Sequence, residues 1–288
     1  MLDLFYTPIA EFEFMQRALV GVIAIALGGG PVGVFLMLRR MSLTGDAMAH
    51  AILPGAAVGY LVAGLSLPAM TIGGLFAGVI VAVAAGLVSR FTALKEDASL
   101  AAFYLLSLAL GVTIVSLRGS NVDLLHVLFG TVLALDDSTL LLIASISTIT
   151  VLALAALYRP LVLECVDPVF LRSVSRAGTP THLIFLGLVV MNLVGGFHAL
   201  GTLLAVGMMM LPAAASRFWS NDITVMMMLS VVIGIASGLC GLLLSFHAEL
   251  PAGPAIILSA GAAYVLSLLL GREGGVLWLA WPGKHLEA

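Results

Sequence analysis

The chain has 288 residues, of which 61% are hydrophobic and only 9% are charged, and its mean hydropathy is +1.19. A soluble domain is about half apolar and about a quarter charged, so a soluble fold is excluded and lipid must be the solvent for much of this protein. The net charge of −3 and the scattered basic residues do not suggest a nucleic-acid-binding surface.

Eight apolar stretches are long enough to cross a bilayer, which takes roughly 20 mostly apolar residues in a helix. The first follows Asp3, Glu11 and Glu13 rather than a basic segment and is longer than a signal-peptide core, so we expect a retained span. Glycine is abundant, and small residues let membrane helices approach closely, which predicts an all-α, polytopic helix bundle forming a single transmembrane domain over residues 1–288. The predicted spans are residues 17–38, 48–64, 69–90, 98–117, 138–158, 181–198, 222–246 and 253–270, with two shorter apolar pieces near 122–135 and 199–217.

The basic residues predict the orientation, because short cytoplasmic loops collect Lys and Arg. If the N-terminus lies outside, if residues 199–217 cross, and if residues 122–135 only dip in and return, ten of the twelve basic residues face the cytoplasm. Only Arg17 and Arg118 then lie outside. We therefore expect eight to nine transmembrane helices plus short half-helices, with the C-terminus in the cytoplasm. The ten are Arg39, Arg40, Arg90, Lys95, Arg159, Arg172, Arg176, Arg217, Arg272 and Lys284.

The stretch MSLTGDAMAHAILPG, residues 41–55, places Asp46 and His50 four residues apart at the start of the second span. Residues with this spacing share one face of a helix. A carboxylate facing lipid costs roughly 2.5–3.5 kcal/mol, so the pair should face the protein interior or a wet cavity. Carboxylate oxygen and imidazole nitrogen are ligands for first-row divalent metals. The alternative is that His50 hydrogen-bonds Asp46 and orders a helix start capped by Thr44 or Ser42.

Two ligands do not complete a coordination shell, and backbone carbonyls, Ser107, Asn192 and His198 are the candidates for the remainder. His198 opens the 199–217 piece, either as a metal ligand or gate or as a polar group at a helix end. Asp123 and His126, three residues apart on the 122–135 piece, form either an outer mouth that attracts cations or a solvated loop pair.

Several enzyme motifs are absent. The sequence contains no G-x-x-x-x-G-K-[ST] nucleotide-binding loop, no H-E-x-x-H metalloprotease motif and no G-x-S-x-G nucleophile elbow. Cys165 in an expected polar loop and Cys240 in an apolar segment predict neither a disulfide nor a cysteine-based metal site. The polar inventory therefore favours transport over catalysis.

Four motifs in order along residues 39–254 resemble the metal-uptake ABC permeases, which are the membrane subunits of bacterial zinc, manganese and iron importers. The chain departs from the family pattern at Thr131, where many members carry an acid or serine, and at Phe103-Tyr104, where some zinc-type members place a histidine. The first motif is Arg39-Arg40-Met41-Ser42-Leu43 with Gly45-Asp46-Ala47, Ala49-His50-Ala51 and Leu53-Pro54-Gly55, and the second is Val122-Asp123-Leu124 with Leu128-Phe129-Gly130. The third runs from Gly201-Thr202-Leu203-Leu204 to Leu211-Pro212-Ala213-Ala214-Ala215-Ser216-Arg217, and the fourth is Leu250-Pro251-Ala252-Gly253-Pro254.

The resemblance implies a type II ABC importer-like permease in the bacterial inner membrane. It implies a homodimeric pore that works with a cytoplasmic ATP-binding subunit and an extracytoplasmic metal-binding protein, and no permanently bound cofactor. It also implies that Asp46 and His50 line the path of zinc or manganese. The alternative function is a gradient-driven secondary cation transporter, although the sequence shows no clear two-half repeat.

A cytoplasmic segment must transmit the motion of such an ATPase. We expect residues 212–222 to do so, because Pro212 breaks the span, Arg217 and Asp222 are polar, and Trp219 is an anchor. Residues 160–181 are the second candidate. For both segments the alternative is an ordinary interfacial loop.

Overall fold

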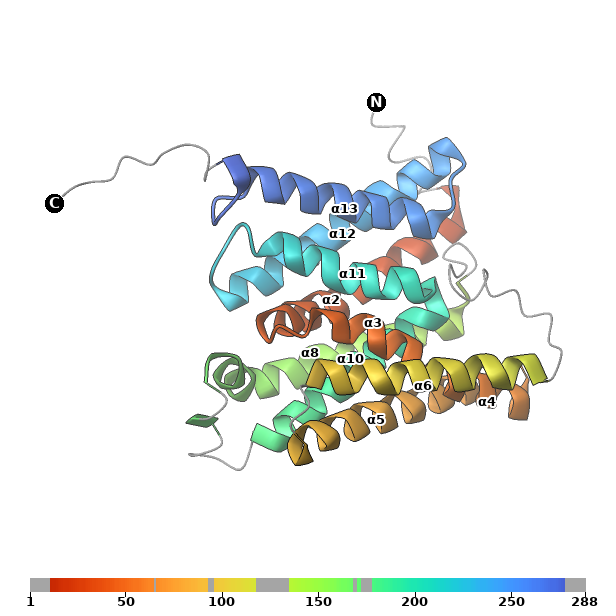
Figure 1. Cartoon of the computed structure of the whole chain (residues 1–288). Helices are drawn as coiled ribbons and strands as arrows, with labels where there is room; N and C mark the ends of the chain where they lie inside the picture. Colours follow the sequence, from red (N-terminus) through yellow and green to blue (C-terminus); the bar gives the residue numbers. More distant parts are fainter. Residues whose placement is uncertain are drawn as a thin grey trace.

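The structure is a computed structural model that describes residues 11–64, 66–92, 96–117, 135–167, 170–171 and 178–277. Figure 1 shows helices packed side by side along one common direction, which confirms the predicted all-α bundle. The helices are α2 (Glu13–Leu38), α3 (Ser42–Ala51), α4 (Leu53–Ala63), α5 (Leu67–Phe91), α6 (Glu96–Leu117), α8 (Asp137–Val166), α10 (Gly178–Leu200), α11 (Thr202–Ser216), α12 (Ile223–Ala248) and α13 (Ala252–Leu270).

Seven helical segments in the described ranges are long and apolar enough to cross a membrane, with α3 and α4 counted together as Ser42–Ala63. Two shorter apolar helices, Ala98–Ile114 and Thr202–Ser216, match the predicted fourth span and the predicted short crossing. The chain is therefore a multi-pass membrane bundle. Most of the predicted 122–135 piece lies outside the described residues.

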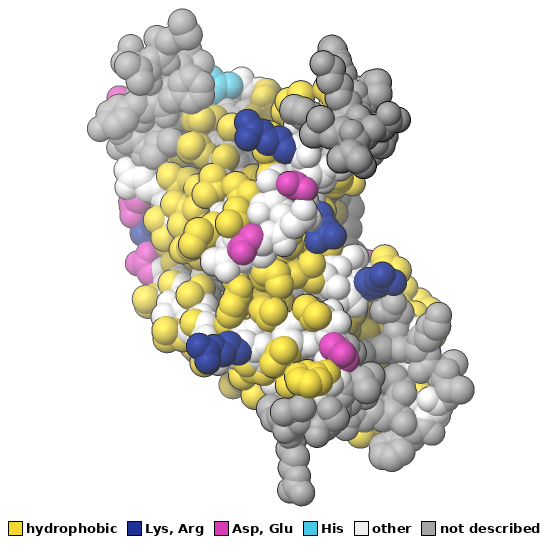
Figure 2. Space-filling model, turned by 90° about the vertical axis from the view of Figure 1, so that its left-hand side faces the viewer, with side chains coloured by type: hydrophobic (Ala, Val, Ile, Leu, Met, Phe, Trp, Pro, Cys, Tyr) yellow, Lys and Arg dark blue, Asp and Glu magenta, His cyan; other side chains and the backbone are white. Residues whose placement is uncertain are grey.

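The connections alternate between two ends of the bundle in the order that the basic residues predict. The α2–α3 turn, the α11–α12 turn and the end of α13 lie on the left of Figure 1, whereas α6 ends and α8 begins on the right. At the right-hand end, Arg17 lies 2.7 Å from Glu13 and 3.3 Å from Asp137. Figure 2 looks onto the opposite end, where basic and acidic side chains stand among hydrophobic ones. Which end faces the cytoplasm stays a prediction from the charges.

Glycines allow two pairs of helices to touch backbone to backbone. A Cβ atom added at Gly33 of α2 would lie 1.9 Å from the carbonyl oxygen of Met209 in α11. A Cβ atom added at Gly55 of α4 would lie 2.0 Å from the carbonyl oxygen of Gly73 in α5. These approaches are possible only without a side chain, as expected where membrane helices associate through packing.

The prediction that the fifth span ends near residue 158 was wrong. Helix α8 continues through Pro160 to Val166, and Leu161, directly after the proline, is fully buried. Cys165 therefore lies in the last helical turn rather than in a loop, and both it and Cys240 are free thiols. Burial of Leu161 and of the Glu164 side chain favours the continued helix, although Pro160 removes one backbone hydrogen bond.

Candidate functional site

A tight turn delivers the chain from α2 into α3. The Arg40 N–H donates to Met37 O at 3.0 Å and the Met41 N–H donates to Leu36 O at 2.9 Å, which is the Schellman pattern of helix termination. Arg40 occupies the left-handed position that glycine normally takes, with φ 59°. The turn reverses the chain, so that α3 starts at Ser42.

The helix that carries the polar pair is interrupted just beyond it. Pro54 lies in the first turn of α4 and has no N–H to donate to the preceding turn. The buried Ser107 hydroxyl of α6 donates to the Ala51 carbonyl at 3.0 Å. Broken helices are tolerated in membranes where neighbouring side chains satisfy the freed backbone groups, so Ser107 serves the backbone at this break.

Asp46 and His50 lie on one face of α3, as predicted. The distance from Asp46 Oδ1 to His50 Nε2 is 3.8 Å, which is too long for a hydrogen bond. Two ligands about 2.1 Å from a metal stand about 3.4 Å apart at a tetrahedral angle, so a small adjustment would let one cation contact both atoms. The Asp46 side chain is 65% exposed and the His50 side chain 27% exposed.

Other groups on and beside α3 remain available to a ligand. His50 Nδ1 and Thr44 Oγ1 are buried and have no hydrogen-bond partner. The alternative in which Thr44 or Ser42 caps the helix start was wrong on this point, because the N-cap of α3 is Met41 and no side chain caps it. The Tyr104 ring of α6 lies 6.1 Å from the His50 ring. Within the described ranges, no group of three or more His, Cys, Asp or Glu residues could hold a metal.

The other predicted ligands lie elsewhere or outside the description. The Asn192 amide donates to Thr150 Oγ1 at 2.7 Å and to Leu188 O at 2.8 Å, which ties α10 to α8. His198 lies in the last turns of α10, but its side chain is outside the described residues, as are Asp123 and His126.

The predicted coupling segment is a turn held against α13. Pro212 does not break the span as expected, since it is buried inside α11, which continues to Ser216. Arg217 is exposed at the end of α11. The Trp219 indole donates to Ser267 Oγ at 3.0 Å, and Asp222 caps α12 by accepting from the Val225 N–H at 3.0 Å.

Sequence reasoning missed a buried ion pair at the same end of the bundle. Glu164 lies 2.6 Å from Arg39, and neither side chain is more than 8% exposed. Glu164 was not singled out because the predicted fifth span ended before Pro160. If the predicted helix had been extended beyond Pro160, Glu164 would have been placed at the level of the Arg39-Arg40 turn.

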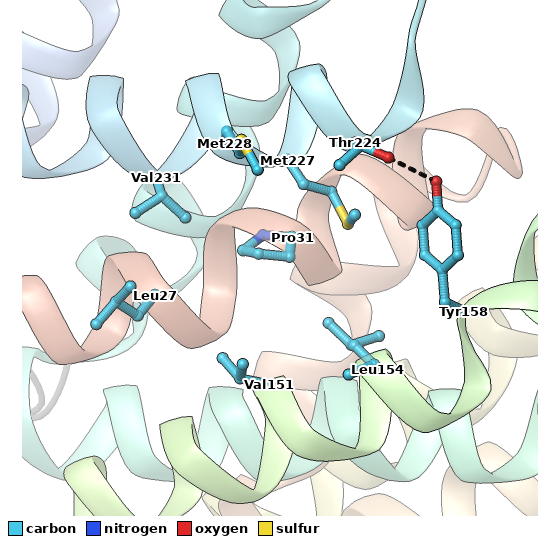
Figure 3. A pocket seen from close by; sticks show the side chains of 10 residues that line it. Leu27, Pro31, Val151, Leu154, Tyr158, Thr224, Met227, Met228 and Val231 are labelled. Atoms are coloured by element: carbon cyan, nitrogen blue, oxygen red, sulfur yellow. Dashed lines mark hydrogen bonds between the residues drawn. The ribbon is translucent and has the colours of Figure 1, made fainter.

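An apolar groove opens among α2, α8 and α12 (Figure 3), and its volume is about 450 Å³. Pro31 lies at its floor, and a 2.8 Å hydrogen bond between the Tyr158 and Thr224 hydroxyls crosses one end. No residue of α3 lines it. The groove offers a cation no charged ligand, so it is not a candidate ion path.

The fold defines a class first: a multi-pass membrane protein built as a helix bundle. Residues 11–271 match the model of the ABC 3 transport family, so the chain belongs to this family of metal-uptake ABC permeases. It is 31% identical to the manganese transport system membrane protein MntC of Halalkalibacterium halodurans, over 99% of this chain and 97% of that protein. It is 30% identical to the manganese import system permease protein ScaB of Streptococcus parasanguinis, over 95% of this chain and 96% of that protein.

Solved structures resemble the whole bundle. A chain of PsaBC from Streptococcus pneumoniae, solved in complex with Fab, aligns with a TM-score of 0.85 and 27% identity, over 98% of this chain and 100% of that chain. An inward-facing metal-chelate type ABC transporter aligns with a TM-score of 0.71 at 13% identity, over 88% of this chain and 85% of that chain, and shares the fold.

Proposed function

We propose that this chain is the permease subunit of an ATP-driven importer of a divalent transition metal, with manganese as the first candidate and zinc as the second. The observation that carries the proposal is the Asp46–His50 pair, with oxygen and nitrogen ligand atoms 3.8 Å apart on a helix of a membrane bundle. The manganese assignment draws on the names of the relatives above. Iron is included among the metals to be tested because another relative is named a probable iron transport system membrane protein.

The chemistry of the pair suits a transported ion better than a resident one. A site in a translocation path must bind an ion well enough to admit it and loosely enough to release it. Two ligands from one chain leave most of a coordination shell to water or to other groups. A mixed oxygen and nitrogen set suits manganese and zinc, whereas thiolates would favour softer metals.

The exposure of Asp46 supports a homodimeric pore. A carboxylate 65% exposed within a membrane bundle needs a polar surrounding. A second copy placed against this face would enclose a passage and bring a second Asp46–His50 pair to it. In this arrangement a cytoplasmic subunit hydrolyses ATP, an extracytoplasmic protein delivers the metal, and the permease itself is not an enzyme. We place it in the bacterial inner membrane, with the N-terminus outside and the C-terminus in the cytoplasm.

The test is metal uptake into proteoliposomes that contain the permease and its ATPase, with the binding protein outside and manganese, zinc and iron in competition. We expect uptake only with ATP on the ATPase side, and manganese taken up in preference to the other two. Uptake without ATP that follows an imposed ion gradient, and that stops when an ionophore collapses the gradient, would instead establish a secondary transporter.

A further inference from the structure

A buried ionic cluster lies where α2, α8 and α10 meet. Arg39 Nη2 lies 2.6 Å from Glu164 Oε1 and 2.9 Å from His182 Nδ1, and His182 Nδ1 lies 3.7 Å from Glu164 Oε1. The side chains of Arg39, Glu164 and His182 are 7%, 8% and 17% exposed. The guanidinium carbon lies 4.9 Å from the centre of the Phe185 ring. The cluster therefore connects the end of α2 to the last turns of α8 and the first turns of α10.

The hydrogen-bonding roles define the charges in this cluster. A guanidinium group can only donate, so His182 Nδ1 accepts from Arg39. The imidazole is then neutral and carries its proton on Nε2. Among the described residues of this cluster, Glu164 carries the negative charge that balances Arg39.

Stability does not explain the cluster. Arg39 Nη1 and Glu164 Oε2 are buried without a hydrogen-bond partner. Each unsatisfied buried atom carries a desolvation cost, which offsets part of the attraction between the two charges. Replacing such a pair with apolar side chains of similar volume is often neutral or stabilising. What the pair does provide is a defined position for the Arg39 side chain.

The position of Arg39 matters because α3 follows directly. Between Arg39 and α3, Arg40 is held in a left-handed conformation that is unfavourable for a residue other than glycine. Helix α3 has ten residues, no side-chain cap at its start and a break at its end. No side chain caps the first turn of α3, and the anchored Arg39 side chain lies directly before the turn that leads into it, so its buried contacts bear on where α3, and with it Asp46, is held.

We propose that Arg39 is a positioning residue for metal transport, because its buried contacts with Glu164 and His182 fix the start of α3 and with it Asp46 and His50. This inference rests on the proposed function of the Asp46–His50 pair. According to this inference, the cluster sets the affinity of the transport site for metal and is not needed for the folding of the bundle.

The decisive variant is the double substitution Arg39→Met with Glu164→Met, assayed in the same proteoliposomes. It removes both charges together, so it leaves no uncompensated buried ion, and we expect the protein to insert and to unfold at or above the wild-type temperature. The KM for manganese uptake should nevertheless rise roughly tenfold. This is the low end of the loss in metal affinity seen when a group that orients a metal ligand is removed.

Two further variants separate positioning from general damage. Thr150→Val removes a different polar link between α8 and α10, the one to Asn192, and does not touch Arg39. It should leave the KM unchanged. His182→Asn keeps an acceptor oxygen close to the place of Nδ1 and should stay near the wild-type KM, whereas His182→Leu should raise it.

A stable double variant with the wild-type KM would overturn the inference, and so would an equal rise of KM in Thr150→Val. If the double variant does not insert, the comparison of His182→Asn with His182→Leu is the test. Equal KM values for these two variants would also overturn the inference. Asp46→Asn in the same assay tests the proposed function separately. Wild-type uptake by Asp46→Asn would contradict the proposed function. If Asp46→Asn loses uptake but the cluster variants keep the wild-type KM, the proposed function stands and only the inference about Arg39 is wrong.

Discussion

The Ser107 hydroxyl of α6 donates to the Ala51 carbonyl at 3.0 Å, at the point where α3 gives way to α4. Two helices distant in sequence are thus joined at the break that follows the polar pair. Ser107→Ala should lower the free energy of unfolding by about 1 kcal/mol, because a buried carbonyl loses its donor. Thr113→Ala is the control, since its hydroxyl bonds to Ala109 of its own helix on an exposed face. Thermal unfolding of both proteins in detergent makes the comparison, and equal stability would contradict this role for Ser107.

The contact of α2 with α11 should not tolerate even a methyl group. Gly33→Ala would place a Cβ atom 1.9 Å from Met209 O and should cost about 1–3 kcal/mol as the helices are forced apart. Gly187→Ala is the matched control, because nothing lies within 4 Å of its added Cβ atom, and it should be neutral or slightly stabilising. The yield of folded protein and its unfolding temperature report the difference. Similar values for the two variants would show that the α2–α11 contact relaxes freely.

The start of α8 should respond to acid. Hydrogen bonds from Ser138 and then Thr139 hold the pKa of the Asp136 carboxyl below its usual value. A lowered folded-state pKa means that the stabilisation is complete above the unfolded pKa of about 3.9 and is lost as the pH falls through the lower folded value. Asp136→Ala should therefore remove stability at pH 7 and remove progressively less as the pH drops toward 3. An equal loss at both pH values would contradict the capping role.

The α11–α12 turn carries our prediction for coupling. Arg217 is exposed, while Trp219 anchors the turn to Ser267 of α13. Arg217→Glu reverses a charge that an ATPase subunit could contact, so we expect ATP hydrolysis to persist while metal uptake is lost and the protein stays inserted. Arg159→Glu, an exposed arginine on α8, is the control and should retain uptake. Normal uptake by Arg217→Glu would refute the assignment.

Hydropathy and loop charge predicted most of the fold. The nine predicted crossings, including the short one at residues 199–217, correspond to helices of the structure, because length and apolar content alone set a membrane span. Helix ends were harder to predict. Pro160 and Pro212 both lie inside helices, since burial of neighbouring residues outweighs the local preference of proline.

The spacing of Asp46 and His50 was enough to predict a shared face, because helix geometry fixes it. The sequence could not predict which residues of other helices contact the chain at the two ends of α3. Ser107 reaches the break between α3 and α4, and Glu164 reaches the α2–α3 turn, each from another helix, and such contacts between distant segments depend on how the bundle packs.

The most direct measurement is ATP-dependent manganese uptake by Asp46→Asn, which keeps the size of the side chain and removes its charge. The variant should insert and assemble with the ATPase as the wild type does, yet take up no metal above the level of empty liposomes. Uptake at the wild-type rate would show that this carboxylate never touches the transported ion, and the path would have to lie elsewhere in the protein.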